Sequence, residues 1–142
     1  MPDCYLLAVA KSSTIDSSSN NFSLYELIES VHIETDQTLE EKTIVQAPFE
    51  VHVYWYVAPE ERGIEYEWRL VAVTPDGEFP GDKNFQLKTD KARHRFRLRG
   101  LPVFLTSQFR LEVEWRKKGN RKWARCYAYW PLDIEYRPST KS

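Results

Sequence analysis

Apolar and polar residues alternate along most of the chain from residue 49 to the C-terminus. A period of two sends alternate side chains to opposite faces of a β-strand, so this pattern predicts strands with one buried face each. The residues expected on the buried faces are Phe49, Val51, Val53, Trp55 and Val57; Ile64, Tyr66, Trp68, Leu70 and Ala72; Ala92, His94, Phe96 and Leu98; Phe109, Leu111, Val113 and Trp115; and Ala124, Cys126, Ala128, Trp130, Leu132, Ile134 and Tyr136.

Turn signals separate these runs. They are "APEERG" at 58–63, "TPDG" at 74–77 and "KKGNRK" at 117–122, each with the proline, glycine or asparagine that tight turns favour. About seven or eight strands, each with one apolar face, must bury those faces against one another. We therefore expect an all-β fold, an immunoglobulin-like or related β-sandwich, with a small closed barrel as the alternative.

The N-terminal third of the chain can be interpreted in two ways. In "SLYELIESV", Ser23 and Glu26 fit a helical capping box, whereas Tyr25, Leu27 and Val31 fit one face of a strand. We favour strand over residues 22–33 because the rest of the chain is so strongly β. The polar stretch 35–46 has room for at most one short helical turn, and the serine-rich stretch 12–21 is typical of a loop.

The length of 142 residues suits one domain. We expect this domain to span 1–137, with a loose tail over 138–142. No apolar run approaches the ~20 residues that cross a bilayer, and the N-terminus lacks the basic segment of a secretory signal. These features predict a cytoplasmic protein with no membrane contact, in which Cys4 and Cys126 are small buried hydrophobes.

The order of three sequence motifs resembles a family of small uncharacterised bacterial β-sandwich proteins, catalogued as a domain of unknown function. The motifs are "FSLYELIESVHI", "HVYWYV…EYEWRLVAVTPDGE" and "RFRLRGLPVFLTSQFRLEVEW…YWPLDIEY", which together span almost the whole chain. The resemblance implies a bacterial cytoplasmic sandwich and supports strand over residues 22–33. It implies no activity and no site residues. The serine-rich loop near residue 17 and the arginine run near residue 95 depart from the family pattern.

Several aromatic residues fall on strand faces opposite the predicted core. They are His52, Tyr54 and Tyr56 in one strand and Trp123, Tyr127 and Tyr129 in or beside the last strand. If they are exposed, they form one apolar patch of a few hundred Å², which is near the largest that a soluble monomer leaves bare. We interpret the patch as an interface for a protein partner or a second copy of the chain. The alternative is that a loop of the same chain, such as 35–46, covers it.

A row of cations is the second unusual feature. Lys91, Arg93, Arg95, Arg97 and Arg99 alternate with the core residues of one strand, so their side chains share a face at intervals of ~6.6–6.8 Å. Such a row can bind the phosphates of a nucleic acid or another polyanion. It can also pair with carboxylates on adjacent strands, Glu112 and Glu114 or Glu65 and Glu67. No aromatic residue alternates with the arginines on their own face, which weighs against single-stranded nucleic acid.

No catalytic or cofactor motif occurs in the sequence. A nucleophile elbow, a glycine-rich phosphate loop and paired zinc-ligand spacings are all missing. The net charge of −1 gives no overall attraction to nucleic acid or anionic membrane. We therefore expect a non-enzymatic protein-interaction or accessory module without metal, cofactor or catalytic nucleophile, and nucleic-acid or polyanion binding through the arginine row is the alternative.

Overall fold

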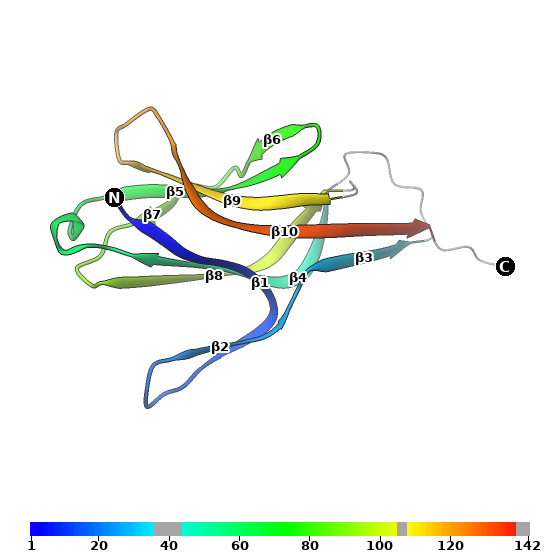
Figure 1. The fold of residues 1–142 in the computed structure, drawn as a ribbon, viewed down its shortest axis with the longest axis horizontal. Helices are drawn as coiled ribbons and strands as arrows, with labels where there is room; N and C mark the ends of the chain where they lie inside the picture. The colour runs from blue at the N-terminus through cyan, green and yellow to red at the C-terminus, as the bar shows by residue number, and fades with distance from the viewer. Residues whose placement is uncertain (36–43, 105–107, 139–142) are drawn as a thin grey trace.

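The computed structural model describes residues 1–35, 44–104 and 108–138, which form two β-sheets packed face to face (Figure 1). The strands are β1 (Asp3–Ile15), β2 (Phe22–Leu27), β3 (Ser30–Thr35), β4 (Ile44–Tyr56), β5 (Tyr66–Thr74), β6 (Gly77–Pro80), β7 (Phe85–Leu87), β8 (Arg93–Phe104), β9 (Gln108–Lys117) and β10 (Ala124–Pro138). A 3-10 turn at Pro59–Glu61 is the one helical element in these ranges. The predicted all-β sandwich is confirmed.

The first sheet is four-stranded, with the order β2-β1-β4-β8. The second is six-stranded, with the order β3-β10-β9-β5-β6, and β7 pairs with the other half of β5. All neighbouring strands are antiparallel except β3 and β10, which are parallel. The described residues thus contain ten strands rather than seven or eight, because the short β6 and β7 are separate strands and residues 22–35 supply two.

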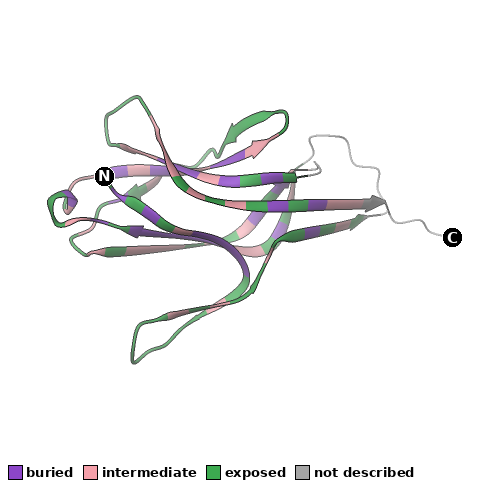
Figure 2. Cartoon of the chain, in the orientation of Figure 1, coloured by how far each residue is buried: buried purple, intermediate pink, exposed green. Residues whose placement is uncertain are grey.

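The core lies between the sheets and contains most of the residues that alternation assigned to it (Figure 2). Trp55 of β4 and Trp68 of β5 are both fully buried, and their rings lie 5.9 Å apart between centroids. Because β4 and β5 belong to different sheets, this contact joins the two layers. Large rings supply much of the apolar area that stabilises a sandwich of this size.

Residues 22–33 are extended, as predicted, but they form two strands in different sheets. β2 pairs with β1 in the first sheet, and β3 pairs with β10 in the second. Between them, the Ile28 amide donates to the Val9 carbonyl and the Asp133 amide donates to the Glu29 carbonyl. The chain therefore crosses from one sheet to the other at Ile28 and Glu29.

β1 changes partner along its length. Its residues from Asp3 to Ala10 pair with β4, and those from Ala10 to Ile15 pair with β2. The second half of β1 and β2 form a hairpin that is drawn below β4 and β8 in Figure 1. We call residues 12–22 at its end the serine hairpin.

The pairing of β4 with β8 brings the two unusual features of the sequence together. Arg93 lies opposite Tyr56, Arg95 opposite Tyr54, and Arg97 opposite His52. Directly paired residues share a sheet face. The arginine row therefore lies beside the tyrosines, on the outer face of the first sheet.

Candidate functional site

The serine hairpin covers the middle of this outer face. The ring of Phe22 lies 5.4 Å from that of Tyr54 and 6.5 Å from that of His52, and Tyr5 lies 6.1 Å from Tyr54 on another side. As a result His52 is 0% exposed and Tyr54 is 6% exposed. The expected exposure of these two residues is wrong, because alternation assigns a side chain to a face without showing whether the chain covers that face. Residues 36–43 of the segment expected to cover it lie outside the described residues.

A small polar network lies under the hairpin. The Ser13 hydroxyl donates to Glu50 Oε1 at 2.7 Å, and the same oxygen lies 3.1 Å from His52 Nε2. The other ring nitrogen of His52 is 3.4 Å from the Tyr54 hydroxyl. Sequence analysis missed Ser13 and Glu50, although Glu50 stands two residues before His52 and so shares its strand face.

Burial and hydrogen bonding shift the pKa values of this network. Burial lowers the pKa of His52, and hydrogen bonding to Glu50 offsets this effect only in part. Burial also disfavours the charged form of Glu50, but the hydrogen bonds from Ser13 and His52, together with the nearby charge of Arg97, outweigh it and lower the pKa of that carboxyl. The folded protein therefore favours a neutral His52 beside an ionised Glu50.

Two arginines of the row hold the hairpin in place. The Arg95 guanidinium lies 4.5 Å from the centre of the Phe22 ring and donates a 2.8 Å hydrogen bond to the Asn20 carbonyl. Arg97 approaches the Ser13 hydroxyl at 3.4 Å. Aromatic rings therefore do accompany the arginines on this face, contrary to the sequence-based expectation. They come from neighbouring strands, so the spacing within β8 could not show them.

The glutamates expected to pair with the arginine row lie on the other sheet, and the expected pairing is wrong. Glu112 and Glu114 of β9 bind Arg69, Arg110 and Arg125, while Glu65 and Glu67 bind Lys88, Lys118 and Arg116. Throughout the described ranges, none of Arg93, Arg95, Arg97 and Arg99 forms an ion pair with a carboxylate.

The start of the row lines a basic hollow of about 590 Å³. Its lining residues are Gly63, Lys88, Thr89, Asp90, Lys91, Arg93, His94 and Arg95. Four of these residues are lysine or arginine, and Asp90 supplies the one carboxylate of the lining. His94 is half-buried and stacks on Phe96 at 4.4 Å, and burial lowers its pKa, so it favours the neutral form.

The other predicted interface residues do not join Tyr54 and Tyr56 in one patch. Tyr127 and Tyr129 belong to β10 of the second sheet, and both are exposed. Trp123 lies between the guanidinium groups of Arg69 and Arg116, at 4.2 and 4.1 Å. Tyr56 is 41% exposed on the first sheet. The single aromatic patch is therefore wrong, because alternation does not reveal which strands share a sheet.

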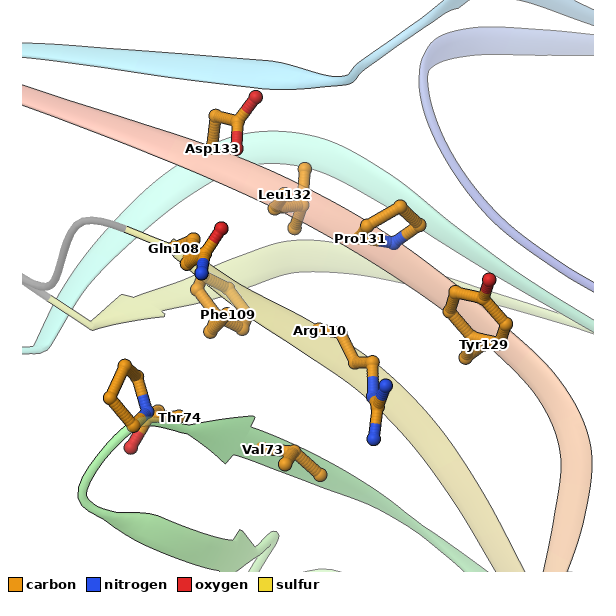
Figure 3. Close-up of a pocket in the computed structure, with 10 residues that line it drawn as sticks. Val73, Thr74, Gln108, Phe109, Arg110, Tyr129, Pro131, Leu132 and Asp133 are labelled. Carbon is orange, nitrogen blue, oxygen red and sulfur yellow. The ribbon is translucent and has the colours of Figure 1, made fainter.

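Tyr129 lines a second hollow, of about 370 Å³, with side chains from β5, β9 and β10 (Figure 3). Arg110 lies 5.5 Å from the Tyr129 ring and donates to Glu112 at 3.0 Å. Within the described chain, no lining side chain of this hollow carries a buried polar atom without a partner. Among all the residues that the structure describes, no group of three or more histidine, cysteine, aspartate or glutamate side chains is placed to hold a metal ion.

Comparison with known proteins assigns this chain to no family. No family model matches the sequence, and no curated protein matches it. A solved structure of the N-terminal domain of PorA aligns with 93% of this chain and 98% of that chain, at 9% sequence identity and a TM-score of 0.26. No helix in the described residues is long and apolar enough to span a bilayer. The resemblance to a bacterial family of unknown function stays a prediction.

Proposed function

We propose that the chain is a non-enzymatic interaction module that binds an acidic protein partner on the outer face of its first sheet. The observation that carries this proposal is the arginine row of β8: none of its guanidinium groups forms an ion pair in the described residues, and the carboxylate beside it, Glu50 opposite Arg99, is hydrogen-bonded to Ser13 and His52. Arg93, Arg97 and Arg99 are also exposed. Exposed arginines on one face match the fork geometry of carboxylates.

The basic hollow supports the same function. It continues the row at the end where β8 begins, and it adds Lys91 to the cations of this face; Lys88, which also lines it, is paired with Glu65. Like charges held close together repel one another, so an anionic partner would relieve repulsion as well as form new contacts. Charge complementarity with such a partner would raise the association rate as well as the affinity.

Nucleic acid is the second candidate partner. The specific observation in its favour is that Tyr5 and Tyr56 are exposed and Arg93 lies near both, 5.9 Å from the Tyr5 ring and opposite Tyr56. Exposed rings beside cations can stack on unpaired bases. We rank it second because Arg95, Phe22 and Tyr54 are already engaged with one another, and the net charge of −1 gives no general attraction to phosphate.

We also propose that the protein works in a bacterial cytoplasm. Cys4 and Cys126 are free thiols, and burial raises the pKa of each to about 12. Thiols of this kind are unreactive at neutral pH, as suits small hydrophobic residues of a protein in a reducing compartment.

A binding titration tests the proposed function. Fluorescence anisotropy would follow a labelled polyglutamate peptide and a labelled oligo(dT) against the wild type and two double variants. Arg97→Glu with Arg99→Glu should weaken peptide binding by about tenfold or more, because two attractive contacts become repulsive. Arg121→Glu with Lys122→Glu makes the same change in net charge on exposed residues of a turn next to the second sheet, and it should leave binding unchanged.

Three outcomes decide between the candidates. Equal losses in both double variants would show that net charge alone attracts the peptide, and absence of peptide binding to the wild type at low salt would contradict the proposal. Binding of oligo(dT) in preference to the peptide, lost in the β8 variant, would favour the second candidate.

A further inference from the structure

β8 is a long strand at the edge of the first sheet. It runs from Arg93 to Phe104, and across the described residues it pairs with β4 alone. An edge strand presents unpaired N–H and C=O groups on its open side, and such an edge can accept a further strand. Proteins usually shorten, bulge or cover edges of this length.

The register shows which residues face the open edge. Tyr56 of β4 lies opposite Arg93 of β8, so the residues one step beyond them, Val57 and Ala92, are also opposite each other. The Val57 amide donates to the Ala92 carbonyl at 2.7 Å, which makes this a hydrogen-bonded pair. In an antiparallel pair, hydrogen-bonded and non-hydrogen-bonded positions alternate. The backbone groups of 94, 96 and 98 therefore point to β4, and those of the four arginines point to the open edge.

Arg93, Arg97 and Arg99 thus offer an incoming strand both backbone groups and an exposed charge, whereas Arg95 offers its backbone while its guanidinium contacts the serine hairpin. Opposed residues of an added antiparallel strand would have Cβ atoms ~4.5–5.5 Å from those of the arginines, on the same face. Carboxylates at alternate positions of that strand would then lie opposite the exposed guanidinium groups of Arg93, Arg97 and Arg99. Within the described ranges no carboxylate of this chain fills that role.

We propose that β8 binds its partner by strand addition: an extended segment of another protein, with Asp or Glu at alternate positions, pairs with the open edge over Arg93–Arg99. This inference rests on the proposed function and specifies its partner. Pro102 has no amide to donate and Gly100 has a φ of +94°, so the regular edge ends near residue 99.

A second copy of the chain does not fit this edge. Antiparallel pairing of two β8 strands would place arginine opposite or next to arginine on one face, and like charges across a strand pair are destabilising. The same arginines therefore oppose self-association through this edge while they favour an acidic strand.

The test uses synthetic peptides of about eight residues. One alternates glutamate and threonine, and the control has the same composition with the glutamates in one block. NMR hydrogen exchange on the whole protein would follow the amides of residues 93–99. With the alternating peptide, the arginine amides should become protected, whereas the amides of 94, 96 and 98 are protected already in the free protein.

Backbone methylation of the peptide gives a matched pair of probes. N-methyl groups on the glutamates remove the amides that face β8, and each lost hydrogen bond should weaken binding roughly two- to tenfold. N-methyl groups on the threonines point away from β8 and should be tolerated.

Two results would overturn strand addition and remain distinguishable. If the alternating and block peptides bind equally well, with no protection of the arginine amides, the face binds anions by charge alone; strand addition is then wrong and the proposed function stands. If neither peptide binds, while both amide sets exchange as in the free protein, strand addition and the proposed function both fail.

Discussion

The two outer faces of the sandwich use arginine in different ways. On the second sheet, Arg69, Arg110, Arg116 and Arg125 each bind one or more glutamates from their own or a neighbouring strand. On the first sheet, the arginines of β8 contact rings, a carbonyl and a hydroxyl but no carboxylate in the described residues. The arginines of the second sheet are thus paired with glutamates of the chain, whereas those of β8 form no ion pair in the described residues, although Glu50 lies opposite Arg99.

This contrast explains why the overall charge is uninformative. The net charge of −1 sums 20 basic and 21 acidic residues over the whole chain, and it does not show that four arginines share one face of β8. Local arrangement, rather than composition, therefore decides what each surface can bind.

The largest expected effect is a difference between the two faces in how far the loss of one charged side chain lowers the free energy of unfolding. Glu114 is 7% exposed and binds both Arg69 and Arg125, so Glu114→Gln should lower the free energy of unfolding by about 2–3 kcal/mol. Arg99→Gln on the first sheet should change it by less than about 0.5 kcal/mol, because no internal ion pair is lost. Urea denaturation of both variants measures the difference, and equal effects would contradict the contrast.

A smaller effect tests whether the serine hairpin, which packs on the first sheet, stabilises the protein. The Phe22 ring packs on Tyr54 and His52, and the Arg95 guanidinium stacks on it. Phe22→Ala removes these contacts and should destabilise the protein by about 1–2 kcal/mol. Tyr25→Ala, an exposed residue of the same strand, is the matched control and should cost less than about 0.5 kcal/mol. A Phe22 variant as stable as this control would show that the serine hairpin does not stabilise the face.

The smallest effect is a pH dependence of stability that comes from two histidines of the first sheet, His52 and His94. Burial lowers the pKa of His52 and of His94, so below the ordinary value of 6.5 the unfolded chain binds more protons than the folded one. Stability should be constant above about pH 7 and fall as the pH falls through 6.5 towards 5. His52→Gln and His94→Gln should each reduce this slope, measured by urea denaturation at several pH values; an unchanged slope in both variants would contradict the assignment.

Sequence alternation identified the strands of the core but not their neighbours. Trp55, Trp68 and Val113 were placed correctly, since a period of two maps directly onto the faces of a strand. No comparable pattern in the sequence shows which strands pair with one another. Alternation could therefore not show that Glu112 and Glu114 lie on the sheet opposite the arginine row.

The serine hairpin was the other feature that sequence reasoning missed. Its residues are mostly small and polar, and the single large ring that it places on the sheet, Phe22, has no periodic neighbours in the loop. Its fold over the sheet depends on contacts with Arg95 and Tyr54, more than thirty residues away. The serine-rich stretch and the arginine run thus contact each other.

One measurement compares the two faces within a single sample. In an NMR titration with polyglutamate peptide at low salt, the side-chain Nε–H signals of arginine report each guanidinium separately. Signals of Arg93, Arg97 and Arg99 should shift with the peptide, while those of Arg69, Arg116 and Arg125 should not, because glutamates of the same chain already bind them. Equal shifts on both sheets, or shifts on the second sheet alone, would contradict the claim that the β8 row is the surface kept for an anionic partner.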